Sequence, residues 1–162
     1  MLKNDLSSLF SRELVFANED ANDFKDLVNN LSLILEQKGY VKNSFRDALL
    51  EREANYPTGL QLNTTGVAIP HTDDIHVLKD AIVIIKLKEP ITVMAMATEN
   101  QEVHVKFVFM LLLKKECSHI DALQRLMDLF TDDSIMDKLK KENEAEELYN
   151  LVSCFMKKRI AD

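Results

Sequence analysis

The chain is short of the residues that interrupt a compact fold. Its 162 residues include three glycines and three prolines, and no glycine- or serine-rich stretch divides them. Flexible linkers and low-complexity segments are built from such residues. A chain of this length can bury one hydrophobic core, so we expect a single domain over residues 1–162.

Cysteine and long apolar runs are scarce as well. Cys117 and Cys154 form neither a close pair nor a zinc-binding spacing, so we expect reduced thiols and no metal site. The longest apolar stretches, 107–113 and 81–85, fall far short of the roughly 20 residues that cross a bilayer. The first residues mix charges with leucines and do not resemble a secretion signal. We therefore expect a soluble, cytoplasmic protein with no insertion into the membrane.

Positive charge is outweighed by negative charge. The formal net charge of -7 argues against nucleic-acid binding, which depends on Lys and Arg neutralising phosphates. An acidic surface instead suits protein partners that carry basic patches. Three glycines in all could not build a Gly-x-x-x-x-Gly-Lys phosphate loop, so no nucleotide cofactor is implied.

The hydrophobic pattern predicts alternating strands and helices. Spacing of three and four residues indicates a helix from Asn22 or Asp23 to Gly39, and Ser44 opens a second one that runs to about Glu53. The other expected elements are strands at 14–17, 66–69, 81–87, 91–94 and 103–113, and helices from 118, over 135–139 and around 148–155. This order predicts an α/β domain with a central mixed β-sheet flanked by helices.

One histidine follows a strand in a position suited to chemistry. The strand that begins at Gly66 stops at Pro70, because proline cannot donate to a sheet ladder, and His71 comes next. A neutral imidazole can attack a phosphoryl donor near neutral pH, and the resulting phosphoimidazole can pass the group onward. The residues alone leave a second interpretation open, in which His71 only fills the corner between a strand and a loop.

The segment from Gly66 to His71 resembles the phosphoacceptor motif of the fructose, mannitol and galactitol class of phosphotransferase system (PTS) enzyme IIA domains. Segment 45–53 resembles the helix that ends in an arginine near the site in this class. Segment 118–126 is similar to the helix that supplies a second active-site histidine in mannitol-type members. Residues 56–60 and the pair His71-Thr72 resemble the galactitol-type branch. The resemblance spans residues 14–152, with the motifs in the expected order.

The resemblance implies a role for each matching residue. His71 would accept the phosphoryl group, and the planar fork of Arg52 would neutralise a phosphoryl oxygen. His119 would hydrogen-bond the phosphate or orient His71. Thr72 replaces the glycine of mannitol and fructose types, so the backbone should differ there, and its hydroxyl or amide could face the phosphate. From the residues alone, Arg52 also fits a solvated helix end, and His119 a surface cap.

The remaining polar residues near the motif carry weaker expectations. His76 follows in a polar loop and could approach His71, although no spacing rule requires it. His104 should lie in a strand and have a structural role. Asp73 and Asp74 would repel a phosphate if they faced it, so we expect them to point to solvent or to contact a basic partner.

The function implied by the resemblance is that of a phosphocarrier, a transferase component without cofactor or metal. It would accept phosphate from the histidine phosphocarrier HPr on His71 and pass it to a cysteine of enzyme IIB, which works with the membrane component IIC in sugar uptake. An alternative is a regulatory module that reports phosphorylation state to a transcription factor or transporter. A metal-dependent hydrolase using His71, His76, His119 and Asp73 is disfavoured, because the His-Glu-x-x-His pattern is missing.

Overall fold

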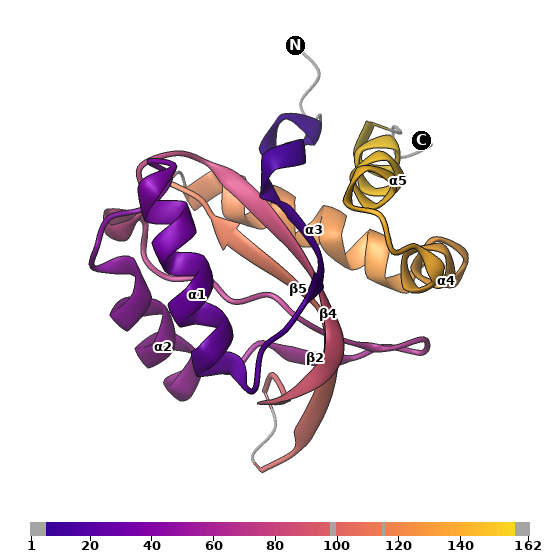
Figure 1. Ribbon diagram of the computed structural model, residues 1–162, viewed down its shortest axis with the longest axis horizontal. Coiled ribbons are helices and arrows are strands. Elements are labelled where there is room, and N and C mark those ends of the chain that lie inside the picture. The colour runs from indigo at the N-terminus through magenta and orange to yellow at the C-terminus, as the bar shows by residue number, and fades with distance from the viewer. Residues whose placement is uncertain (1–5, 98–99, 115, 158–162) are drawn as a thin grey trace.

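The protein folds into three layers, with one sheet between two groups of helices. The computed structural model describes residues 6–97, 100–114 and 116–157, the side chains of residues 116–119 excepted. Figure 1 shows α1 and α2 on one side of the strands, and α3, α4 and α5 on the other. The predicted α/β architecture is confirmed.

The sheet is mixed and has five strands in the order β1-β4-β5-β3-β2. Strands β1 and β4 are parallel, as are β3 and β5, whereas the pairs β4-β5 and β2-β3 are antiparallel. Their bounds are Val15–Glu19 for β1, Gly59–Gln61 for β2, Gly66–Ala68 for β3, Ala81–Met94 for β4 and Glu102–Leu112 for β5. The predicted central mixed sheet is therefore confirmed.

The helices divide between the two faces of the sheet. On one face lie α1, Phe24–Gln37, and α2, Phe45–Asn55. On the other face lie α3, Glu116–Thr131, α4, Asp133–Lys141, and α5, Ala145–Lys157. Short 3-10 helices occupy Ser7–Leu9 (η1), Arg12–Leu14 (η2) and Asp74–His76 (η3). Among the described helices, none is long and apolar enough to cross a membrane.

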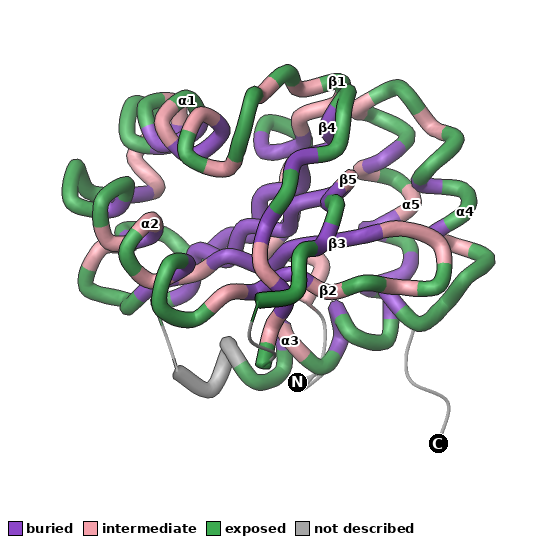
Figure 2. The backbone as a smooth tube through the Cα atoms, turned by 90° about the horizontal axis from the view of Figure 1, so that it is seen from below, coloured by how far each residue is buried: buried purple, intermediate pink, exposed green. Residues whose placement is uncertain are grey.

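Strand β4 supplies the core on both of its faces. Val83 and Ile85 pack toward α1 and α2, whereas Ile82 and Ile84 pack toward the three C-terminal helices. Successive side chains of a strand point to opposite faces, so a strand covered on both sides is a continuous apolar run. Figure 2 shows these buried segments gathered in the middle of the molecule, between the two helical layers.

The strand register contains an irregularity that the sequence pattern did not predict. Gly66 and Val67, which are adjacent in β3, pair with Val105 and Phe107 of β5. Lys106 is thus one extra residue in β5, which is a β-bulge. The predicted strands 81–87 and 91–94 are one strand, β4, that shifts register across the same region. The short strand β2 was not predicted at all.

The predicted helix ends at Asp23, Gly39 and Ser44 agree with the structure. The Asp23 side chain accepts a hydrogen bond from the Asp26 amide and caps α1, and Gly39 follows the helix with a φ of 81°. Ser44 precedes α2 as expected, but its side chain accepts no hydrogen bond from the first amides of the helix. Its hydroxyl lies 2.8 Å from His76 Nδ1 instead, which ties α2 to η3.

A buried lysine joins the sheet to the C-terminal helices. Lys86 of β4 is 3% exposed, and its ammonium group donates to the carbonyls of Leu139, Lys140 and Glu142 at 3.0, 2.7 and 2.5 Å. These carbonyls lie at the C-terminal end of α4, where a helix has no internal donors left and favours a positive charge. Burial lowers the pKa of Lys86, the nearby charge of Lys106 lowers it further, and the Glu142 carboxylate offsets part of the effect.

Replacing Gly66 with Ala should destabilise the sheet beside the histidine. A Cβ at this position would overlap the backbone carbonyl of His104, so β3 would have to move away from β5. Crowding of this kind costs about 1–3 kcal/mol. Urea unfolding should show a lower unfolding free energy for Gly66→Ala than for wild type. Gln61→Ala, at an exposed position of the neighbouring strand β2, should leave the unfolding free energy unchanged. Equal stability of Gly66→Ala and wild type would contradict the close approach.

Candidate functional site

The candidate site lies where β3 ends between its two neighbours. The ladder stops at Ala68, and the chain continues through Ile69 and Pro70 to His71. The Leu111 amide donates to the Pro70 carbonyl at 3.0 Å, and His71 forms an isolated parallel bridge with Leu111 of β5. The strand end thus holds the backbone of a half-buried His71.

The His71 ring is oriented by the backbone just before it. Its Nδ1 atom lies 2.8 Å from the carbonyl oxygen of Ile69. A carbonyl can only accept a hydrogen bond, so Nδ1 carries the proton and donates. In the neutral ring the lone pair then resides on Nε2. The local backbone therefore selects which ring nitrogen can act as a nucleophile.

A second hydrogen-bonded chain reaches the same backbone from α2. The Ile69 amide donates to the hydroxyl of Thr58 at 3.2 Å. Thr58 in turn donates twice to the Glu53 carboxylate, from its hydroxyl to Oε1 at 2.6 Å and from its amide to Oε2 at 2.7 Å. Glu53 and Thr58 are 8% and 4% exposed, so this connection lies within the protein.

The Glu53 carboxyl has an unusual protonation equilibrium. Burial raises its pKa from 4.5 to about 7, although the two hydrogen bonds from Thr58 work in the opposite direction. Removing a carboxylate from water disfavours its charged form, and donors to the charged form favour it. Near neutral pH the protein therefore holds Glu53 partly protonated.

Arg52 lies at the C-terminal end of the same helix, one residue before Glu53. Its guanidinium carbon is 4.6 Å from the centre of the Tyr56 ring, which is 64% exposed. Stacking of this kind holds the guanidinium plane while leaving its edge open to hydrogen bonds. The structure thus brings Arg52 to the end of α2 that is connected to β3, with its side chain against Tyr56.

The residues that follow His71 separate into buried and exposed ones. Thr72 is 8% exposed, and its φ is not positive: in the described chain, positive φ values occur at Asn18, Gly39, Ala97 and Asn100. The difference expected from a glycine-containing backbone stays a prediction. Asp73 and Asp74 are exposed, as predicted, and Ile75 beside them is 64% exposed.

The other three histidines have different positions. His119 belongs to α3, but its side chain lies outside the described part of the structure. His76 Nδ1 lies 2.8 Å from the Ser44 hydroxyl. His104 is in β5, as predicted, where its Nδ1 lies 3.2 Å from the Thr92 hydroxyl. In the described residues, no three His, Cys, Asp or Glu side chains are grouped as a metal ion would require.

Glu53 and Thr58 were not singled out from the sequence, although a signal was present. Phe45, Leu49 and Glu53 recur every four residues, so they share one face of α2, and all three are buried. A glutamate on the core face of a helix requires a hydrogen-bonding partner. That partner could not be read from the helix, because Thr58 follows it in an irregular segment.

A half-buried histidine at the end of a short strand of a mixed sheet characterises the site. Comparison with known proteins identifies the family. Residues 8–154 match the family described as "Phosphoenolpyruvate-dependent sugar phosphotransferase system, EIIA 2". The chain belongs to this family of PTS enzyme IIA components. The resemblance noted in the motifs is thereby confirmed, and the protein is a phosphotransfer component of the sugar phosphotransferase system.

Relatives with sequence similarity include carriers and a regulator. The galactitol-specific EIIA component of Escherichia coli K12 is 26% identical over 117 residues, covering 72% of this chain and 77% of the relative. The transcriptional regulator ManR of Bacillus subtilis is 30% identical over 131 residues. That match covers 80% of this chain but 19% of the regulator, so the similarity concerns one part of ManR.

Solved structures share the fold at lower identity. The mannitol enzyme IIA in its complex with phosphorylated enzyme IIB, from Escherichia coli, has a TM-score of 0.71 and 22% identity, covering 90% of this chain and 99% of that chain. The nitrogen regulatory protein IIA-Ntr of Neisseria meningitidis has a TM-score of 0.72 and 21% identity, covering 91% and 98%. These likenesses establish the three-layer fold independently of the motifs.

Replacing Glu53 with Gln should flatten the pH dependence of stability between about pH 4.5 and 7. The folded protein keeps the Glu53 proton in this window while the unfolded chain releases it, so the unfolding free energy falls as pH rises. The fall should be of the order of 3 kcal/mol, at about 1.4 kcal/mol per pKa unit. Urea unfolding at several pH values would measure it.

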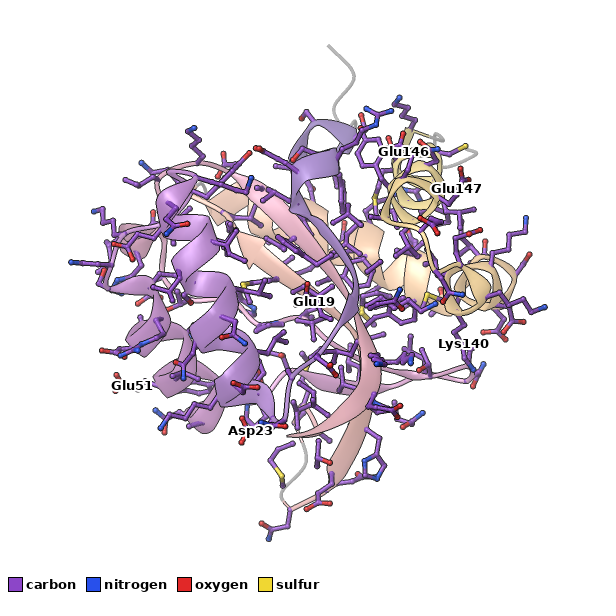
Figure 3. All side chains as sticks on the ribbon, viewed as in Figure 1. Glu19, Asp23, Glu51, Lys140, Glu146 and Glu147 are labelled. Atoms are coloured by element: carbon purple, nitrogen blue, oxygen red, sulfur yellow. The ribbon has the colours of Figure 1, made fainter. Side chains whose placement is uncertain are left out.

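The matched control is Glu51→Gln, on the outer side of the same helix. Figure 3 shows Glu51 pointing away from the body of the protein. This variant should keep the wild-type slope of unfolding free energy against pH. Parallel curves for Glu53→Gln and wild type would contradict the raised pKa.

Proposed function

We propose that this protein accepts a phosphoryl group from phospho-HPr on Nε2 of His71 and passes it to a cysteine of enzyme IIB. In the first step the P–N bond to the HPr histidine breaks and a P–Nε2 bond forms. In the second step the cysteine thiolate attacks phosphorus and the P–Nε2 bond breaks. Each step transfers one phosphoryl group, so phosphate is conserved and no cofactor enters.

The observation that carries the proposal is the hydrogen bond from His71 Nδ1 to the Ile69 carbonyl. It leaves the lone pair on Nε2 in the neutral ring, as an attacking nitrogen requires. Attack through Nε2 creates positive charge on the ring, because Nδ1 keeps its proton. The Ile69 carbonyl accepts that proton's hydrogen bond throughout, so it stabilises the developing charge without reorganisation.

Two further side chains complete the proposed site. Arg52 would offer its guanidinium edge to a phosphoryl oxygen, and its stacking on Tyr56 supports a fixed orientation. His119 would hydrogen-bond the phosphate or orient His71 from α3. Thr72 would contribute its hydroxyl or amide. Phosphoryl transfer depends mainly on such positioning and charge compensation.

Exposed apolar side chains near these residues support a shared docking surface. Tyr56, Ile75 and Ile120 are 64%, 64% and 60% exposed, and each lies within four residues in sequence of Arg52, His71 or His119. Asp73 and Asp74 add negative charge beside Ile75. A shallow apolar patch with acidic neighbours suits brief complexes with proteins that carry basic patches. HPr and enzyme IIB would bind it in turn.

The similarity to a galactitol-specific component makes galactitol the first sugar to test. A regulatory role is the second candidate, favoured by the similarity to part of the regulator ManR. In that role the phosphorylated domain would act on a transcription factor or transporter. Genes for IIB and IIC beside the gene of this protein would favour uptake, and their absence would favour regulation.

His71→Ala should abolish labelling of the protein by phospho-HPr. The variant removes the proposed accepting nitrogen, while the backbone bonds of Pro70 and Leu111 can remain. Labelling would be followed with enzyme I, HPr and labelled phosphoenolpyruvate, and the labelled residue mapped by mass spectrometry. His76→Ala and His104→Ala should be labelled as wild type. Undiminished labelling of His71→Ala would refute the assignment of the accepting residue.

Arg52→Ala and His119→Ala should slow phosphoryl transfer without abolishing it. One hydrogen bond to a charged group is worth about 1.5–3 kcal/mol, which corresponds to roughly ten- to a hundred-fold in rate if it forms in the transition state. Rapid-quench measurement of transfer from phospho-HPr would give the rates. Arg46→Ala is the control, because Arg46 is an exposed arginine of the same helix paired with Asp47 at 3.0 Å. Wild-type rates in both test variants would rule out their participation.

A further inference from the structure

We propose that Glu53 is a positioning residue for His71 and acts through Thr58 and the backbone of Ile69. The carboxylate fixes the direction of the Thr58 hydroxyl, the hydroxyl fixes the Ile69 peptide, and the Ile69 carbonyl holds His71 Nδ1. This inference rests on the proposed function and adds to it the means by which α2 controls the accepting histidine.

The Glu53 carboxylate is buried for its hydrogen bonds to Thr58. Glu53 is 8% exposed, and an apolar residue on this face of α2 would avoid the cost of taking a carboxyl group out of water. Both carboxyl oxygens instead accept hydrogen bonds from Thr58. These two bonds are short and charge-assisted, a type that is stronger than a neutral hydrogen bond. The carboxyl group thus fixes Thr58 more firmly than a neutral acceptor would.

The Thr58 hydroxyl has a single proton to donate. A hydroxyl has one donor and two acceptor positions. Since its proton points to Glu53 Oε1 at 2.6 Å, the lone pairs of Thr58 Oγ1 are left for the Ile69 amide at 3.2 Å. The carboxylate therefore determines that this hydroxyl faces Ile69 as an acceptor.

Ile69 lies just beyond the last paired residue of β3. Strand β3 ends at Ala68, and Pro70 has no amide proton with which to continue the pairing. On the β5 side, the Leu111 amide binds the Pro70 carbonyl at 3.0 Å. On the opposite side, the Ile69 amide donates to the Thr58 hydroxyl. The Ile69 carbonyl that faces His71 thus belongs to a peptide group whose neighbours on both sides are held by hydrogen bonds.

Adding a proton to this hydrogen-bonded chain weakens it. A protonated Glu53, or a glutamine in its place, turns one acceptor into a donor that faces Thr58. The Thr58 hydroxyl proton or amide then loses its acceptor in a buried place, which costs free energy and favours a rearranged hydroxyl. The reoriented hydroxyl then holds the Ile69 amide less firmly, and the His71 ring can adopt the other tautomer.

Other charged groups face Glu53 across a hollow between three elements. Asp23 and Lys25 of α1 line this hollow together with Glu53, and Thr92 of β4 lines it from the sheet. On α2 itself, Glu51 and Arg52 are the charged neighbours in sequence. A pH effect on His71 must therefore be assigned to Glu53 by substitution.

The test is the tautomer of His71 in the unphosphorylated protein. Nitrogen-15-labelled histidine and long-range proton–nitrogen correlation distinguish Nδ1–H from Nε2–H in the neutral ring. Wild type should hold the Nδ1–H form above about pH 8, where the Glu53 carboxyl is charged. Glu53→Gln and Thr58→Val should raise the Nε2–H share several-fold, whereas Thr58→Ser, which keeps the hydroxyl, should restore the wild-type spectrum. Glu51→Gln should match wild type.

An unchanged His71 tautomer in folded Glu53→Gln and Thr58→Val would overturn the proposal. If neither variant folds, wild type provides the test: the His71 ring shifts should carry an inflection at the pH at which the Glu53 carboxyl carbon titrates. Independent titrations of the two groups would likewise overturn it.

Transfer measurements separate this proposal from the proposed function. Glu53→Gln should still be labelled on His71 by phospho-HPr, but about ten- to a hundred-fold more slowly, because small displacements of a reacting group have effects of this size. Normal labelling of wild type with an unchanged tautomer in the variants would overturn the positioning role alone. Labelling at another residue would overturn the proposed function and leave the tautomer result standing.

Discussion

The site depends on the way the sheet ends at Pro70. A proline in this position stops the β3 ladder, since it cannot donate, while its carbonyl still accepts the Leu111 amide. The chain therefore leaves the sheet abruptly but remains tied to β5. His71 follows at a fixed place, and its ring turns back to the Ile69 carbonyl. The position of His71 at this edge is a consequence of that backbone path.

The mixed order of strands explains why one short strand can be held so firmly. Strand β3 has three residues, yet it lies between β5 and β2 and its residues are buried. Gly66 lets the backbone of β5 approach, and the extra residue Lys106 sets the register between them. The strand end is thus positioned by its neighbours rather than by its own length. In the proposed function this matters, because the His71 ring would meet two partners in the same geometry.

Burying the Glu53 carboxyl costs desolvation free energy, and the packing of α2 does not require a carboxyl group at this position. An apolar side chain would fill the same face of α2 without the cost of taking a carboxyl group out of water. Both oxygens of the Glu53 carboxyl accept hydrogen bonds from Thr58. Buried polar groups of this kind favour one arrangement over its alternatives. Here the arrangement that we propose to be favoured is the contact of Thr58 with the Ile69 amide.

The sequence by itself determined the fold class, most element positions, the end of β3 before His71 and the family. These depend on periodicity, on proline and on contiguous motifs, all of which act over short distances along the chain. It missed β2 and the bulge at Lys106, since register depends on the neighbouring strand.

Only the tertiary structure decided the partners of the polar side chains. Folding places His76 against Ser44. It places Glu53 next to Thr58, whose hydroxyl accepts a hydrogen bond from the Ile69 amide. A pattern of apolar residues reports which face of a helix is buried. It does not report which donors and acceptors meet there, because a hydrogen bond requires two groups, often from different segments, to lie within about 3 Å.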